Sequence, residues 1–267
     1  MSIAAILLPL LRSAGVRLAG VLTIATVADE EAGGGNGTAA LLASGARADA
    51  AVYLDGSNQT IWNTGLGGGF AEVSLTAGSR QGLNELTAWT RATITGLKKA
   101  RKQAIIDHPD FGGDFFRNAM PGFFDIQQRE VDAGVQLTFF LDTLPGENEE
   151  DLKRHVESAL QAGEGLKINW MSRFLKASPA MPKEHPLVSE LSRSFKTATG
   201  RDARVGPGRQ SDQGLVSYFG NMPCVLFGCG RLGQAGAPHL PNEYILLKEF
   251  EENLLTMALM TVNWCGS

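Results

Sequence analysis

Residues 20–55 constrain the fold of this 267-residue chain more than any other stretch. They hold an apolar, largely β-branched run at 21–27, three consecutive acids at 29–31, a glycine cluster and a second apolar run that ends in Asp55. This order predicts a strand, an acidic turn, a short helix and a second strand. Because the first run has no polar alternation, we expect it to be a buried strand of a parallel sheet.

The three acids are expected at the carboxyl end of that first strand, where ligands bind in open α/β sheets. Adjacent carboxylates repel one another, so a fold that gathers them at a crevice either solvates them or supplies a cation. Neighbouring residues that leave a strand point in different directions, so Glu31 can hold a metal while Glu30 faces a metal-bound water. Asp55 reaches the same crevice from the next strand. We therefore expect a metal site, with a solvated acidic turn as the alternative.

The glycine cluster is also consistent with nucleotide binding. Residues 35–40, GNGTAA, fit the G-x-G-x-x-A dinucleotide fingerprint, and Asp55 follows at nearly the spacing of a ribose-binding acid. In that fingerprint the glycines follow the strand directly, so that a helix N-terminus meets the pyrophosphate. Here the acids at 29–31 intervene, and their charge opposes phosphate. The pattern therefore favours a metal over a nucleotide.

Composition and charge argue against several classes of partner. A net charge of -4 and a pI near 5.6 provide no basic stripe for a nucleic acid. The three cysteines form no C-x-x-C pair, which suits a reducing cytoplasm and gives no zinc-finger pattern. The apolar run at 2–11 is too short to span a membrane and has no basic residue before it. We therefore expect a cytoplasmic protein with no nucleic-acid partner and no membrane partner.

The order of predicted elements indicates an α/β protein with an inserted α+β domain. Helices and strands alternate at both ends of the chain, as in a mostly parallel sheet with helices on both faces. The elements expected there are helices at 2–14, 37–44, 185–199, 212–219 and 246–264 and strands at 20–27, 50–54 and 223–227. In the middle we expect strands at 70–75, 123–128, 134–141 and 166–174 and helices at 82–104 and 147–162. That order is the split βαβ pattern of a ferredoxin-like domain.

Two segments are expected to delimit the insertion. Residues 60–69, TIWNTGLGGG, are rich in Asn, Thr and Gly, and residues 179–186 contain three prolines, so both are typical of linkers. We therefore expect residues 1–69 and 179–267 to form the larger α/β domain and residues 70–178 to form the inserted domain.

His239 lies in a Gly- and Pro-rich segment just before the last predicted helix. Functional histidines are often held on loops by a rigid scaffold. With Glu31 and Asp55 expected at the same sheet edge, we predict that His239 is a metal ligand. The other histidines are expected to be surface groups or a neighbour of a helix cap: His108, His155 and His185.

Gly228, Cys229 and Gly230 follow the buried strand expected at 223–227. Their backbone N–H groups could bind a substrate carboxylate or an oxyanion. An ordinary exit from strand to loop is the alternative. Cys229 has no His close in sequence, and the chain has no G-x-S-x-G motif, so neither a cysteine nucleophile nor an α/β-hydrolase is favoured.

Several of these motifs together resemble one known family. They are ADEEAGG at 28–34 with Gly37, the acid that ends the next strand, LDTLPGENEE at 141–150, HPLV at 185–188, Ser-Asp at 211–212 and GAPHLPNEYI at 236–245. In combination they are similar to the di-zinc family of acetylornithine deacetylase, succinyl-diaminopimelate desuccinylase, aminoacylase and glutamate carboxypeptidase, over essentially the whole chain. The resemblance implies a catalytic α/β domain with an inserted lid domain that also mediates dimerisation.

By position, the resemblance assigns a role to each candidate residue. It implies that Glu30 is the general base, that Glu31 and His239 bind one zinc ion, and that Asp55 binds a second. Cobalt or manganese are alternatives to zinc. The implied function is metal-dependent hydrolysis of amide bonds, or of ester bonds, in N-acyl amino acids or small peptides, by a homodimer or higher homo-oligomer.

The sequence also departs from the family's pattern. In the family, the first zinc ligand lies in an upstream H-x-D strand, and a bridging aspartate stands just before a Met that opens a helix, which residues 1–5 match. The sequence therefore contains neither ligand. Residues 75–80 contain no His where the family has Ala-His-Ser, and Thr143 replaces an Arg. Because a catalytic zinc typically keeps three protein ligands, we expect weak metal binding. The alternative function is a non-catalytic, metal-poor, dimeric binding or regulatory protein.

Overall fold

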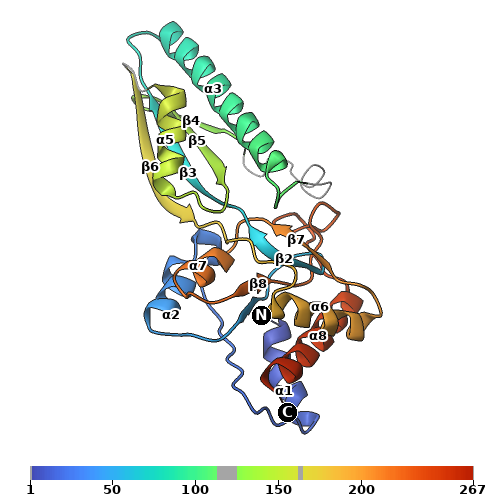
Figure 1. The fold of residues 1–267 in the computed structure, drawn as a ribbon. Helices are drawn as coiled ribbons and strands as arrows, with labels where there is room; N and C mark the ends of the chain where they lie inside the picture. The colour runs from blue at the N-terminus through green and yellow to red at the C-terminus, as the bar shows by residue number, and fades with distance from the viewer. Residues whose placement is uncertain (1, 113–124, 162–164, 267) are drawn as a thin grey trace.

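The computed structural model describes residues 2–112, 125–161 and 165–266. Its strands form two separate four-stranded sheets, called sheet A and sheet B, which occupy different parts of the molecule (Figure 1). The strand order is β1-β8-β2-β7 in sheet A and β4-β5-β3-β6 in sheet B. The predicted fold class, a mostly parallel α/β sheet with an α+β unit, is confirmed.

Sheet A is mixed, with mostly parallel pairs. Its strands are β1 (Ala51–Tyr53), β2 (Thr60–Gly65), β7 (Arg204–Gly208) and β8 (Cys224–Leu226). β1 runs parallel to β8 and β2 runs parallel to β7, while the pair Trp62 and Leu226 joins the two halves in antiparallel orientation. Because β1 and β8 are parallel, the residues that follow them, Asp55 and Gly228, come to the same edge of the sheet.

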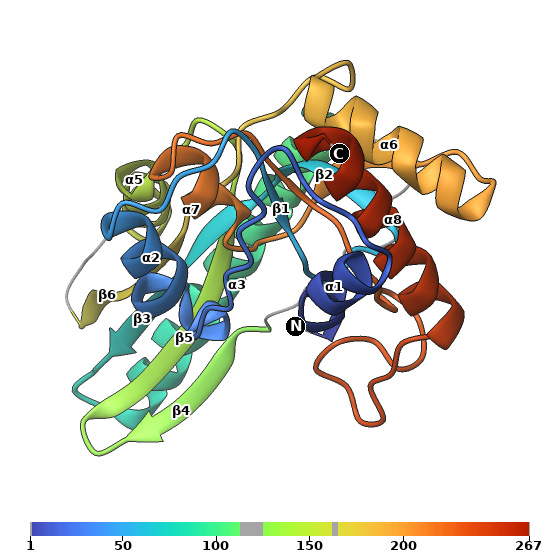
Figure 2. The ribbon, with the colours of Figure 1, turned by 90° about the horizontal axis from the view of Figure 1, so that it is seen from below.

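Three long helices pack into the core beside sheet A. They are α1 (Ser2–Ser13), α6 (Pro186–Thr199) and α8 (Leu247–Cys265), and α8 contacts both of the others (Figure 2). The helix α6 begins where the side chain of His185 accepts a hydrogen bond from the N–H of Leu187, and it ends at Gly200, whose φ is 72°. His185 is thus a helix cap. None of the described helices is long and apolar enough to cross a membrane.

Sheet B is antiparallel throughout and is covered by two helices. Its strands are β3 (Gly67–Leu75), β4 (Gln127–Val131), β5 (Gly134–Thr143) and β6 (Leu166–Leu175), and its helices are α3 (Arg80–Asp107) and α5 (Glu149–Leu160). The chain order β-α-β-β-α-β is the predicted ferredoxin-like pattern. Inward-facing residues of β5, such as Leu137 and Phe139, alternate with less buried ones. Parts of the strand expected at 123–128 and of the helix expected at 147–162 lie outside the described residues.

The buried strand predicted at 20–27 is wrong, because this segment has no regular secondary structure. Gly20 donates a backbone hydrogen bond to Cys265 in α8 at 2.8 Å, and Leu22 and Ile24 pack against the core of sheet A. Val21, in contrast, is 87% exposed. β-Branched residues favour extended backbone, but a strand also needs a neighbour to pair with. No strand in the described part of the chain pairs with this segment.

The segment 60–69, predicted as a crossing between domains, leads from sheet A to sheet B but is not an irregular linker. This stretch forms β2 and the first residues of β3. Its glycines allow close packing between strands, since a Cβ on Gly67 would lie 2.3 Å from the backbone oxygen of Leu175. The strand β7 was not predicted because its sequence, RVGPG, has no apolar alternation and contains a proline.

An ion pair between α3 and the segment after β5 is expected to stabilise the folded protein. Arg101 of α3 donates to both carboxylate oxygens of Glu147, at 2.9 and 2.5 Å, and its side chain is only 10% exposed. We expect Arg101→Ala to lower the free energy of unfolding by about 3 kcal/mol, because Glu147 would keep a partly buried charge without this partner. Urea denaturation followed by circular dichroism measures the loss.

The matched control is Arg154→Ala, which removes an exposed pair with Asp151 within α5. Since the Arg154 side chain is 70% exposed, the expected loss is about 0.5 kcal/mol. Equal losses for the two variants would contradict the distinction drawn here between a buried and an exposed pair.

Candidate active site

The three consecutive acids lie in a tight turn. Residues Glu30–Ala32 form a single 3-10 turn, η1, between residues with left-handed backbone: Asp29 at φ 71° and Gly33 at φ 103°. A carboxylate oxygen of Asp29 accepts a hydrogen bond from the backbone N–H of Asn36 at 3.0 Å. The turn leaves Glu30 half-buried and Glu31 exposed. A π-helix, η2 (Gly35–Ala39), and a short helix, α2 (Ala40–Ala43), follow where one helix was predicted at 37–44.

The structure brings Glu31 and His239 together. Nε2 of His239 lies 3.8 Å from Oε2 of Glu31, although the two residues come from opposite ends of the chain. His239 adopts a left-handed backbone conformation with φ 64°, and its N–H lies 3.3 Å from a carboxylate oxygen of Glu243. The local backbone of the loop 236–245 therefore turns the imidazole toward the acidic turn.

Asp55 lies near the same pair. Burial raises the pKa of its carboxyl group, the N–H of Gly56 at 2.6 Å lowers it, the charge of Glu31 raises it and that of His239 lowers it. The residue has access to solvent, but protein atoms lie densely around the carboxylate. Asp55, Glu31 and His239 thus form one electrostatic cluster at the end of β1.

Glu30, which lies beside this cluster, has a carboxyl group with a strongly raised pKa. Burial, the largest cause, and then the charges of Asp55, Asp212 and Glu31 together raise its pKa to about 7. A carboxylate with a pKa near 7 can both accept and return a proton at neutral pH. The residue therefore has the protonation behaviour of a general acid and base.

Asp212 is a buried carboxylate that the sequence did not single out as a site residue. It precedes the short helix α7 (Gln213–Tyr218), is 0% exposed, and accepts a hydrogen bond from Oγ1 of Thr38 at 2.5 Å. Burial raises the pKa of Asp212, the Thr38 hydroxyl lowers it, and the charges of Asp29 and Asp55 raise it. The sequence offered only a Ser-Asp pair after a Gly-rich segment, a signal too short to imply a role.

The segment after β8 packs against the backbone of Asp55. The N–H of Gly228 donates to Oγ of Ser57 at 2.9 Å, so it already has a partner within the protein. A Cβ on Gly228 would lie 2.0 Å from the backbone oxygen of Asp55. Burial raises the pKa of the Cys229 thiol to about 11, which disfavours a reactive thiolate. The substrate-binding role expected of the backbone at Cys229 and Gly230 stays a prediction.

Comparison with known proteins identifies the family. The sequence matches the family model described as peptidase family M20/M25/M40 over residues 1–262. The chain belongs to this peptidase family. The resemblance drawn from the sequence motifs is thereby confirmed. No curated protein matches the sequence.

Solved structures of the M20 fold are similar to this chain. The di-peptidase Dug1p from Saccharomyces cerevisiae has 11% identity and a TM-score of 0.61, over 90% of this chain and 64% of that chain. Human carnosine dipeptidase 1 has 13% identity and a TM-score of 0.62, over 98% and 71%. The M20 family metallo-carboxypeptidase Sso-CP2 from Sulfolobus solfataricus has 14% identity and a TM-score of 0.56, over 87% and 68%. At these identities the likeness establishes the fold alone.

The donors near the acidic turn fit a metal ion in type but not in number. Carboxylates and an imidazole are zinc ligands, and Glu31 with His239 offers one of each. Across the residues that the structure describes, however, no three His, Cys, Asp or Glu side chains are arranged to hold a metal. A catalytic zinc typically takes three protein ligands. The described part of this M20 chain therefore supplies an incomplete ligand set.

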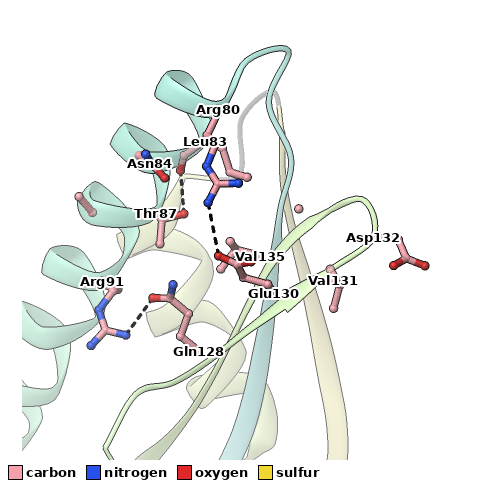
Figure 3. Close-up of a pocket in the computed structure, with 12 residues that line it drawn as sticks. Arg80, Leu83, Asn84, Thr87, Arg91, Gln128, Glu130, Val131, Asp132 and Val135 are labelled. Carbon is pink, nitrogen blue, oxygen red and sulfur yellow. Dashed lines mark hydrogen bonds and ion pairs between the residues drawn. The ribbon is translucent and has the colours of Figure 1, made fainter.

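A cavity elsewhere in the described structure does not belong to this site. It encloses about 410 Å³ between α3 and the β4–β5 hairpin (Figure 3). Arg80 lies 3.8 Å from Glu130 there, and Arg91 donates to Gln128 at 3.4 Å. Arg80 and Glu130 thus form an ion pair there, and none of the predicted site residues lines the cavity.

A glycine beneath the acidic turn provides a test of the M20 site's geometry. A Cβ on Gly37 would lie 1.9 Å from the backbone oxygen of Ala28, just before the turn. We expect Gly37→Ala to lower the free energy of unfolding by about 1–3 kcal/mol, because the backbone must shift. Gly35→Ala is the matched control in the same π-helix, since a Cβ there meets nothing within 4 Å. It should be neutral or slightly stabilising in urea denaturation, and equal effects would refute the close approach.

Proposed function

We propose that this M20 chain is a metal-dependent hydrolase of amide bonds in small peptides or N-acyl amino acids, with Glu30 as the general base. The observation that supports this most directly is the pair of Glu31 and His239, whose side chains lie 3.8 Å apart directly beside Glu30 in the chain. Two of the similar structures are named as dipeptidases and one as a carboxypeptidase, which motivates the substrate class. Simple esters are a further candidate substrate.

In the proposed reaction, Glu30 takes a proton from water as the water oxygen bonds to the substrate carbonyl carbon. Glu30 then returns the proton to the amine nitrogen as the C–N bond breaks, so the carboxylate is regenerated. Glu31 and His239 would hold the ion, with Asp55 beside them in the same electrostatic cluster, and zinc, cobalt or manganese bound there would polarise the substrate carbonyl. The sheet-B unit, residues 70–178, would be the lid between the two catalytic segments, residues 1–69 and 179–267, and would mediate homodimerisation.

A conservative substitution tests the role of Glu30. Glu30→Gln keeps the size of the side chain but cannot accept the proton, so kcat should fall at least about 100-fold with KM little changed. The assay uses N-acetyl-L-alanine, alanyl-glycine and a simple ester. Glu130→Gln, which removes an exposed carboxylate near α3, is the control and should keep full activity. Unchanged turnover in Glu30→Gln with metal retained would exclude Glu30 as the base.

Metal content tests the ligand assignment separately. We expect zinc bound by the purified chain to fall clearly in Glu31→Gln and in His239→Ala, because each variant removes one of two donors that lie 3.8 Å apart. Elemental analysis after dialysis against micromolar zinc measures this, with Glu130→Gln, which removes an exposed carboxylate away from the site, as the control. Equal zinc in all three variants and in the parent chain would contradict the assignment.

A second candidate function is a non-catalytic binding or regulatory protein with the same fold. It is favoured by the incomplete ligand set of the described residues. Stoichiometric zinc together with turnover that a chelator abolishes would exclude it. A chain that binds no zinc and shows no turnover on any of the three substrates would instead support it.

A further inference from the structure

Asp212 occupies an unusual position beneath the acidic turn. Its carboxylate is fully buried, and one oxygen, Oδ2, accepts the hydroxyl of Thr38, which is itself only 3% exposed. The other oxygen, Oδ1, has no hydrogen-bond partner among the described residues. A buried carboxylate with one unpaired oxygen lowers the stability of the folded protein. Such a group in a native structure calls for a compensating role.

The unpaired oxygen faces the backbone of the turn. A Cβ on Gly34 would lie 2.2 Å from Oδ1 of Asp212, so the carboxylate packs directly against this glycine. Gly34 closes the turn, because its N–H donates to the backbone oxygen of Asp29 at 2.7 Å and its φ is 68°. Its own carbonyl accepts from the N–H of Ala39 at 3.0 Å, so the same residue begins the π-helix. Asp212 thus contacts the π-helix at two points: at Gly34, which precedes it, and at Thr38, near its end.

Asp212 is in turn held by its chain neighbours. Oγ of Ser211 accepts a hydrogen bond from the N–H of Gln213 at 3.2 Å, which fixes the start of α7. Nε2 of Gln210 donates to Oδ1 of Asp142 in β5 at 2.5 Å and to the backbone oxygen of Gly67 at 3.2 Å. The segment that bears Asp212 is therefore anchored to sheet B by contacts that do not involve the acidic turn.

We propose that Asp212 is a positioning residue of the hydrolase, which fixes the Glu30–Glu31 turn through its contacts with Thr38 and Gly34. The hydrogen bond from the Thr38 hydroxyl is charge-assisted and buried, which makes it stronger than a neutral surface bond. Without this bond, the π-helix that follows the turn would be released at its fourth residue, Thr38. The effect on turnover rests on the proposed function, whereas the effect on the turn does not.

The test compares Thr38→Val, which has nearly the same shape but no hydroxyl, with Thr38→Ser, which keeps the hydroxyl. Thr90→Val is the matched control, because Thr90 is a fully buried threonine of α3 whose hydroxyl bonds the oxygen of Leu86 far from the turn. Amide hydrogen exchange at residues 33–39 of the full chain reports the turn, and kcat and KM on alanyl-glycine report its consequence. Thermal denaturation of each variant establishes that it is folded.

We expect Thr38→Val to exchange about tenfold faster at residues 33–39, to lose about tenfold in kcat and to keep KM within about twofold. Thr38→Ser should restore both measurements, and Thr90→Val should leave both unchanged. If Thr38→Val does not fold, Asp212→Asn replaces it, with the same expected directions because a neutral acceptor binds the hydroxyl more weakly.

Several outcomes would overturn the proposal. Unchanged exchange in Thr38→Val excludes Asp212 as the anchor of the turn, and faster exchange with unchanged kcat excludes a positioning role. If the parent chain hydrolyses nothing, the proposed function fails, and the exchange experiment still decides whether Asp212 holds the turn. If Thr38→Ser behaves like Thr38→Val, the hydroxyl is not the operative group.

Discussion

The crowding of carboxylates around one turn is the constraint on which the site depends. Asp29, Glu30, Asp55 and Asp212 are crowded together there, and burial and neighbouring charges raise the pKa of Glu30, Asp55 and Asp212. Three of them have a compensating hydrogen-bond donor: the N–H of Asn36 for Asp29, that of Gly56 for Asp55 and the hydroxyl of Thr38 for Asp212. In the described part of the chain no such donor reaches Glu30, and this is the carboxyl group whose pKa rises to about 7.

The backbone conformation around the turn keeps these carboxylates close together. A left-handed residue at each end, Asp29 and Gly33, reverses the chain within a few residues. Close backbone contacts then hold the neighbouring segments: Gly37 lies against Ala28, and Gly228 lies against Asp55. A side chain at either glycine would separate elements that must stay in contact for their carboxylates to interact. Gly37 and Gly228 therefore serve close packing, whereas a Cβ on Gly35 would meet nothing within 4 Å.

Much of the fold could be predicted, where local sequence and tertiary packing agree. The strand β5 alternates apolar and less buried residues, and α5 begins with a capping box between Asn148 and Asp151, so both were recognisable. The segment 21–27 has equally strong strand propensity but no pairing partner among the described strands, and pairing cannot be read from one segment alone. The strand β7 shows the converse, since RVGPG forms a strand only because β2 lies beside it.

The candidate site could be predicted in part. Glu31 and His239 were expected to meet, both from the placement of His239 in a loop before the last helix and from the family resemblance, and the structure brings them within 3.8 Å. Asp212 had no comparable signal, because its importance arises from burial against Gly34 and Thr38, which come from a distant part of the chain. Residue type indicates which chemistry is available, whereas desolvation and neighbouring charge decide which carboxylate performs it. A cation beside Glu31 would lower the pKa of Glu30 and relieve the same repulsion that now raises it, so the crowded carboxylates favour cation binding even where the ligand set is short.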